Sequence, residues 1–102
     1  MIKVNYNDKV IKISGHANFN DYGKDIVCAS VSSIVYTTIN GILNINKDAI
    51  EFSDNNIMII NVKMNDEITN KLIANMLDLL KDLELQYPKN INISKGEWTC
   101  YL

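Results

Sequence analysis

Apolar and polar residues alternate with a period of two in two short runs near the start of the chain. The apolar positions are Ile2, Val4 and Tyr6 in the first run and Ile11 and Ile13 in the second. Such alternation is typical of strands that bury one face. The residues between the runs, Asn7-Asp8-Lys9, are typical of a tight turn. We therefore predict a hairpin of two strands over residues 2–7 and 9–15.

Residues 16–23 follow the hairpin and show neither a helical nor a strand period. Polar residues fill this segment, and glycines flank it at Gly15 and Gly23. Such a composition is typical of a loop. We expect Gly15 and Gly23 to act as its hinges.

From Asp25 onward the apolar residues take the spacing of a helix. One side of residues 25–43 carries Val27, Val31, Ile34, Val35, Thr38 and Ile42. Many of these side chains are β-branched and favour helices poorly, so the helix needs burial against a sheet for its stability. We expect Asp25 or Lys24 near its N-cap.

The second half of the chain repeats the order of a strand pair followed by a helix. Residues 49–53 and 57–63 predict two strands around an Asp54-Asn55-Asn56 turn. Asn65 is the expected N-cap of the next helix, because acidic residues at 66 and 67 suit its first turn. That helix ends before Pro88, and its apolar stripe comprises Ile68, Leu72, Met76, Leu79, Leu80 and Leu83. Residues 91–102 alternate like a strand, with an interruption at Lys95-Gly96.

This order of elements predicts an α+β fold with two layers. We expect two long helices packed on one face of a largely antiparallel β-sheet. The chain has 102 residues, of which 47% are hydrophobic, and this is enough apolar material for one core. Residues 1–102 are therefore expected to form a single domain.

Charge and hydropathy limit the kinds of partner. The formal net charge is −2, which disfavours a surface that binds phosphate backbones, so we expect no direct contact with nucleic acid. The first residues alternate like a strand and do not resemble a signal peptide. No apolar run approaches membrane-spanning length. We expect a cytoplasmic protein without a membrane partner.

Candidate chemistry gathers in the segment between Ser14 and Ser32. It contains His16, the only histidine, and Cys28, one of two cysteines. A thiol is a good nucleophile only as the thiolate, which the first turn of a helix and a nearby imidazole both favour. Cys28 lies in that turn, so His16 and Cys28 are candidates for a base and its nucleophile. The backbone N–H groups of Cys28 or Ala29 are candidate donors to an oxyanion.

Helical spacing puts Asp25 and Ser32 on the same face as Cys28. Two roles are open for Asp25: it orients His16, as the third member of a hydrolytic triad does, or its charge lies near the sulfur and opposes thiolate formation. Ser32 also has two possible roles. It donates a hydrogen bond to the thiolate, or it is a small residue where helix and sheet approach.

Three short stretches of this segment carry a family resemblance. Gly15-His16-Ala17, Tyr22-Gly23-Lys24-Asp25-Ile26-Val27-Cys28-Ala29 and Val31-Ser32 resemble the signature of the bacterial ribosomal-processing cysteine protease family. Length and element order are similar over the whole chain. The resemblance implies a cysteine endopeptidase that removes the N-terminal extension of a bacterial large-subunit ribosomal protein. It also implies a catalytic pair at His16 and Cys28, supporting positions at Asp25 and Ser32, a homodimer, and a mobile loop at residues 16–23.

These residues also have simpler structural interpretations. A lone cysteine early in an apolar helix is usually an inert core residue, and only its combination with His16 in the signature favours catalysis. Cys100 and Trp98 alternate like core-facing strand residues and match no motif. One histidine and two distant cysteines make no metal site, and we expect no cofactor. The alternatives are a non-catalytic, ribosome-associated peptide-binding module and a thiol redox sensor at Cys28.

Overall fold

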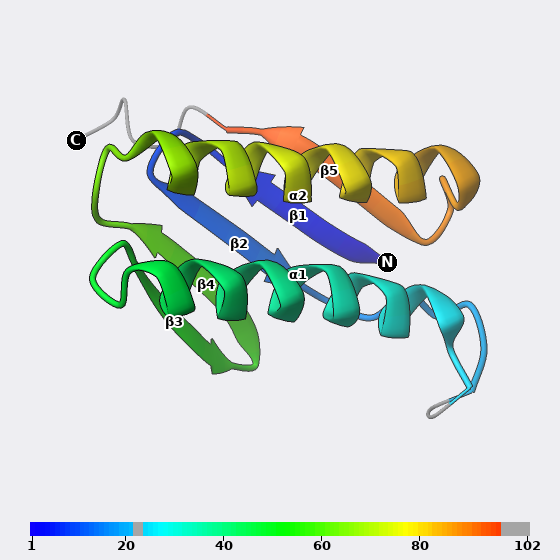
Figure 1. Cartoon of the computed structure of the whole chain (residues 1–102). Coiled ribbons are helices and arrows are strands. Elements are labelled where there is room, and N and C mark those ends of the chain that lie inside the picture. Colours follow the sequence, from blue (N-terminus) through cyan, green and yellow to red (C-terminus); the bar gives the residue numbers. More distant parts are fainter. Residues whose placement is uncertain (22–23, 97–102) are drawn as a thin grey trace.

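The computed structural model describes residues 1–21 and 24–96. Within them two helices lie side by side on one face of a β-sheet (Figure 1). The elements in chain order are β1 (Ile2–Tyr6), β2 (Val10–Ser14), α1 (Ile26–Ile45), β3 (Ile50–Asn55), β4 (Ile57–Val62), α2 (Glu67–Gln86) and β5 (Ile91–Lys95). This arrangement confirms the predicted two-layer α+β fold.

The sheet has the strand order β3-β4-β2-β1-β5. The pairs β1–β2, β2–β4 and β3–β4 are antiparallel, whereas β5 runs parallel to β1. The sheet is therefore largely antiparallel, as predicted. Of the strand-like tail, residues 91–95 form β5, and Trp98 and Cys100 lie outside the described residues.

The first hairpin forms as its alternation predicts. Ile2, Val4, Ile11 and Ile13 are buried beneath the helices, and the intervening lysines are exposed. Asn7 closes the turn, because its Oδ1 accepts hydrogen bonds from the N–H groups of residues 9 and 10. This hairpin ends at Ser14 and so delivers the following loop to the N-terminal end of α1 (Figure 1).

Helix α1 begins directly after Asp25, which is its N-cap. It ends at Ile45, two residues beyond the predicted Leu43, and its buried residues are Val27, Val31, Val35, Ile39 and Ile42. Ile39 was absent from the predicted stripe, while Ile34 and Thr38 are only half-buried. The buried residues are spaced three or four apart, because residues with this spacing lie on one face of the helix.

The expectation that no apolar run approaches membrane-spanning length was wrong for α1. Among the described residues this helix of 20 residues, with a mean hydropathy of 1.6, is long and apolar enough to cross a membrane. Its valine and isoleucine face is instead buried against the sheet and α2. Helix α1 is rich in β-branched residues and needs many apolar side chains to be stabilised by burial. The same apolar side chains make it resemble a membrane-spanning helix.

Helix α2 differs from its prediction in its cap and in its buried face. Asp66, not Asn65, is the N-cap, because Asp66 Oδ2 accepts hydrogen bonds from the backbone N–H and the hydroxyl of Thr69. Ile68 and Leu79 were predicted in the core but are 52% and 43% exposed. The residues that are buried are Thr69, Ile73, Met76, Leu77, Leu80 and Leu83. Apolar residues occur on two adjacent faces of this helix, and packing on the sheet selected one of them.

The second hairpin is tighter than predicted. Asp54 and Asn55 belong to β3, and Asn55 already pairs with Ile57 of β4. Asn56 alone reverses the chain, at φ 65°. Asparagine tolerates this left-handed conformation better than most residues, which permits the short connection.

Gly15 follows β2 in a conformation that favours glycine, with φ 85°. A Cβ at this position would lie 2.3 Å from the carbonyl oxygen of Met1, a backbone atom that cannot move aside cheaply. Gly15 therefore permits the close approach that starts the loop. Its predicted role as a hinge stays a prediction, and Gly23 lies outside the described residues.

We expect Gly15→Ala to lower the free energy of unfolding by about 1–3 kcal/mol, through strained backbone and the clash with Met1. Urea denaturation measures this change. Gly41→Ala is the matched control, because a Cβ there meets nothing within 4 Å. Within α1, alanine at this position should raise stability by about 0.5–1 kcal/mol. Equal stability of Gly15→Ala and wild type would contradict the close approach.

Candidate active site

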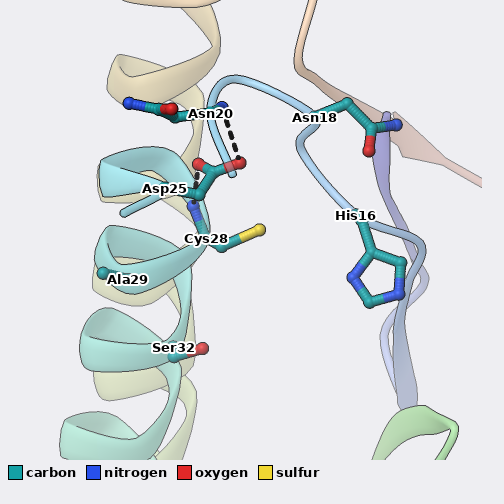
Figure 2. A pocket seen from close by; sticks show the side chains of 7 residues that line it. All are labelled: His16, Asn18, Asn20, Asp25, Cys28, Ala29 and Ser32. Carbon is teal, nitrogen blue, oxygen red and sulfur yellow. Dashed lines mark hydrogen bonds between the residues drawn. The ribbon is translucent and has the colours of Figure 1, made fainter. Parts of the chain in front are cut away.

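A cavity of about 540 Å³ lies between the N-terminal end of α1 and the loop after β2. Figure 2 shows its lining side chains, which are His16, Asn18, Asn20, Asp25, Cys28, Ala29 and Ser32. The structure thus brings together the four predicted residues His16, Asp25, Cys28 and Ser32. They come from the two segments on either side of residues 22–23.

Cys28 is half-buried in the first turn of α1 and carries a free thiol. Its sulfur points away from the helix axis into the cavity (Figure 2). The backbone N–H of Ala17 donates a hydrogen bond to Sγ at 3.3 Å. A donor aimed at sulfur favours its negatively charged form, because hydrogen bonds to ionised acceptors are the stronger ones.

His16 is exposed and lies across the cavity from Cys28 and Ser32 (Figure 2). The strand β2 and Gly15 place it there, since its residue is the second after the strand ends. Within residues 1–21 and 24–96, no hydrogen bond joins its ring to Sγ. Catalytic hydrogen bonds are often long before substrate binds, and the arrangement therefore fits a pair that closes around a ligand.

The carboxylate of Asp25 accepts hydrogen bonds from four backbone N–H groups. Its Oδ1 accepts hydrogen bonds from the N–H groups of Val27 and Cys28, both at 3.0 Å. Its Oδ2 accepts from Phe19 at 2.9 Å and from Asn20 at 3.4 Å. Asp25 thus caps α1, within the expectation of Asp25 or Lys24, and ties the loop to the helix, while its two possible effects on His16 and on the sulfur stay predictions.

These contacts also set the charge state of Asp25. Desolvation is the largest single influence and alone would raise the pKa of this carboxyl. The backbone donors at Cys28, Phe19, Asn20 and Val27 together outweigh it, and they hold the pKa below the ordinary value of 3.8. The ionised carboxylate is thus the form that the fold binds.

We expect Asp25→Asn to lower the Tm by several degrees at neutral pH and to flatten its acid dependence. A carboxyl whose pKa is lower in the folded state stabilises the fold above the unfolded-state value and loses that contribution as the pH falls through the folded-state pKa. The loss therefore occurs below pH 3.8. Thermal unfolding between pH 2 and about 7 measures it. Asp78→Asn, which changes an exposed carboxylate on α2, is the control. An unchanged acid profile for Asp25→Asn would contradict the assignment.

Both predicted oxyanion donors make hydrogen bonds to Asp25 in this structure, and their role toward an oxyanion stays a prediction. The Cys28 N–H donates to Asp25 Oδ1, and the Ala29 N–H donates to the Asp25 carbonyl oxygen at 3.1 Å. Capping and oxyanion binding compete for the same N–H groups at a helix N-terminus. Here Asp25 has taken them.

Ser32 is half-buried one turn beyond Cys28, and its hydroxyl points into the cavity (Figure 2). Among the described residues no hydrogen bond joins it to the sulfur. It also lines a second cavity of about 240 Å³, together with His16, Cys28 and residues of the β3–β4 hairpin. The two cavities therefore meet at the sulfur and the imidazole.

The hairpin side of the second cavity is held by Tyr36 of α1. Its hydroxyl donates a hydrogen bond to the carboxylate of Asp54. This hydrogen bond, with desolvation and the charge of Asp54 adding to it, raises the pKa of Tyr36 above its ordinary value. The ring of Tyr36 also packs edge-on against Phe52, with centroids 5.6 Å apart. These contacts fasten the hairpin to α1.

Two contributors to the site were missed in the sequence. Ala17 supplies the N–H that reaches Cys28 Sγ, and Asn90, 73 residues further along the chain, holds the Ala17 carbonyl. Ala17 was within the quoted motif, but a backbone donor leaves no trace in residue type. Asn90 had no sequence signal at all. The described residues contain no group of three His, Cys, Asp or Glu side chains that could hold a metal ion.

A free thiol at a helix N-terminus, facing an imidazole across a cavity, is the arrangement expected of a cysteine peptidase. The family described as cysteine protease Prp matches residues 1–92. The chain belongs to this family of cysteine peptidases.

Relatives agree with this assignment over nearly the whole chain. The ribosomal processing cysteine protease Prp of Mycoplasma genitalium is 35% identical over 101 residues, covering 96% of this chain and 99% of the relative. Its namesake in Staphylococcus aureus is 31% identical over 99 residues, covering 91% and 93%.

Solved structures show the same fold. The crystal structure of the S. aureus Prp protease with a covalently linked product peptide has a TM-score of 0.83 at 24% identity, covering 93% of this chain and 97% of that one. Another, with a substrate peptide, has a TM-score of 0.77 at 22% identity and the same coverage.

Proposed function

We propose that this protein is an endopeptidase that removes the N-terminal extension of a bacterial large-subunit ribosomal protein, with His16 and Cys28 as its catalytic pair. The observation that carries the proposal is the Cys28 thiol, facing His16 across one cavity and accepting an N–H from Ala17. The ribosomal-processing names of the M. genitalium and S. aureus relatives support the substrate class.

The chemistry is acyl transfer. His16 accepts the thiol proton of Cys28, and the thiolate attacks the scissile carbonyl carbon. Collapse of the tetrahedral intermediate breaks the C–N bond, and His16 returns the proton to the departing amine. Water, deprotonated by His16, then attacks the thioester, which releases the carboxylate product and restores the thiol.

The meeting of the two cavities suits an extended peptide. His16, Cys28 and Ser32 line both of them, so a chain that crosses the sulfur has room on either side of the scissile bond. The larger cavity is bordered by residues 16–21, and the exposed side chains of this loop are the part expected to close over substrate. Such closure would bring the His16 ring to the sulfur while the backbone of Ala17 stays fixed.

The proposal includes a cytoplasmic location and a homodimer, both implied by the family resemblance. Light scattering after gel filtration tests the dimer, and fractionation of cells expressing the chain tests the location. A monomer at micromolar concentration would remove the dimer from the proposal and leave the chemistry unaffected.

Incubation with the extended ribosomal precursor tests the function, with intact mass spectrometry as the readout. We expect one cut that separates the extension from the mature protein. A truncated precursor without the extension serves as the control and should remain uncut. Binding of the precursor without cleavage would overturn the proposal and favour a peptide-binding module.

A further inference from the structure

The backbone of Ala17 lies between Cys28 on one side and Asn90 on the other. Its N–H donates to Cys28 Sγ at 3.3 Å, and its carbonyl oxygen accepts from Asn90 Nδ2 at 2.9 Å. Ala17 is 1% exposed, while His16 and Asn18 on either side of it are exposed. Ala17 is thus the point at which this part of the loop is fixed to the core.

Asn90 is itself held firmly between α2 and β5. Its N–H donates to the Tyr87 carbonyl oxygen at 3.0 Å, and its own carbonyl oxygen accepts from the Ile2 N–H at 2.9 Å. Ile2 begins β1, which pairs with β5. Asn90 is thus fixed in the turn that directly precedes β5, far in sequence from the loop whose Ala17 it holds.

The direction of the Ala17 N–H decides whether it reaches the sulfur of Cys28. A hydrogen bond weakens steeply as its donor angle opens, and rotation of the peptide plane turns the N–H away from the sulfur. After Ala17 the chain turns through the left-handed Asn18, at φ 54°. The N–H and the carbonyl of Ala17 belong to the two peptide groups that meet at its Cα. Asn90 holds the carbonyl, and burial of the Ala17 side chain restrains the Cα between them, so Asn90 limits how far the N–H can turn away from the sulfur.

We propose that Asn90 is a positioning residue for the proposed protease chemistry: by holding the Ala17 carbonyl it keeps the backbone of Ala17 in place, so that the Ala17 N–H stabilises the Cys28 thiolate. The inference rests on the proposed function for its catalytic meaning. Its physical content, an amide that controls the reactivity of a thiol, is measurable without any peptide substrate.

The test is the rate of alkylation of Cys28 by iodoacetamide, in a Cys100→Ser background that leaves one cysteine. Each rate at neutral pH is divided by its plateau at alkaline pH, where the thiol is fully ionised. This ratio cancels changes in access to the sulfur. We expect it to fall about three- to tenfold in Asn90→Ala and in Asn90→Leu, which keeps the bulk of the side chain.

Asn92→Ala is the matched control, since Asn92 is exposed on β5 two residues away. It should leave the ratio unchanged. If folded Asn90→Ala and Asn90→Leu keep the wild-type ratio of alkylation rates and still cleave the precursor, the inference about Asn90 is overturned and the proposed function is not. If the wild-type protein does not cleave the precursor, the proposed function is overturned, and the alkylation result is unaffected.

A measurement on the unmodified site covers the case in which the Asn90 variants do not fold. The Ala17 amide proton, followed by NMR in 15N-labelled wild type, should shift across the pH range in which alkylation accelerates. Cys28→Ser separates this response from any due to the neighbouring His16. An Ala17 signal with the same pH dependence in wild type and Cys28→Ser would contradict the hydrogen bond to sulfur.

Discussion

Cys28→Ala should lower the rate of precursor cleavage by about 10⁴-fold or more, since alanine leaves no nucleophile and no covalent route. Single-turnover assays with excess enzyme, read by mass spectrometry, can detect such a low remaining activity. The side chain is half-buried at the cavity wall, so the variant should fold and still bind the precursor.

The matched control is Cys100→Ser, which removes the other thiol of the chain. It should cleave at the wild-type rate and lose activity on treatment with iodoacetamide. Cleavage by Cys28→Ala at a rate near that of wild type would contradict the nucleophile assignment. Insensitivity of Cys100→Ser to the reagent would contradict it independently.

His16→Ala should reduce kcat by about 10²–10⁴-fold, the usual contribution of a positioned general base and acid. The ring is exposed, so the free energy of unfolding of the variant should lie within about 0.5 kcal/mol of the wild-type value. A catalytic loss without a stability loss distinguishes proton transfer from a structural role.

Added imidazole sharpens this result. The cavity beside Cys28 is open enough to admit a small base in place of the missing ring. We expect millimolar imidazole to restore part of the activity of His16→Ala and none of that of Cys28→Ala. Full activity in His16→Ala without imidazole would show that another base serves the thiol.

Local patterns predicted most of the fold. The two-residue period of Ile2, Val4, Ile11 and Ile13 marked strands whose apolar side is indeed buried, because alternation follows directly from strand geometry. The start of an apolar helical run marked an N-cap at Asp25 or Lys24, and the structure has it at Asp25. Among the predictions that were wrong, the cap of α2 was a choice between two near-equal local options, Asn65 and Asp66.

The face of α2 illustrates why sequence was insufficient there. Ile68 and Leu79 are apolar residues that lie beside the buried face of this helix and are themselves exposed. The helix can turn only one face to the sheet, and contact with α1 and β5 made that choice. The packing energy of each helix face depends on contacts with residues that are distant in sequence.

The same division runs through the site. The sequence alone determined that the single histidine and Cys28 would lie at opposite ends of one loop, and that the helix dipole would act on the thiol, since both depend on adjacent residues. Only the tertiary structure decided what surrounds the sulfur. Asp25 took the N–H groups of the first helical turn, and Asn90 reached Ala17 across 73 residues. Hydrogen bonds between backbone groups and remote side chains require only that the partners meet in space, and residue spacing does not record such meetings.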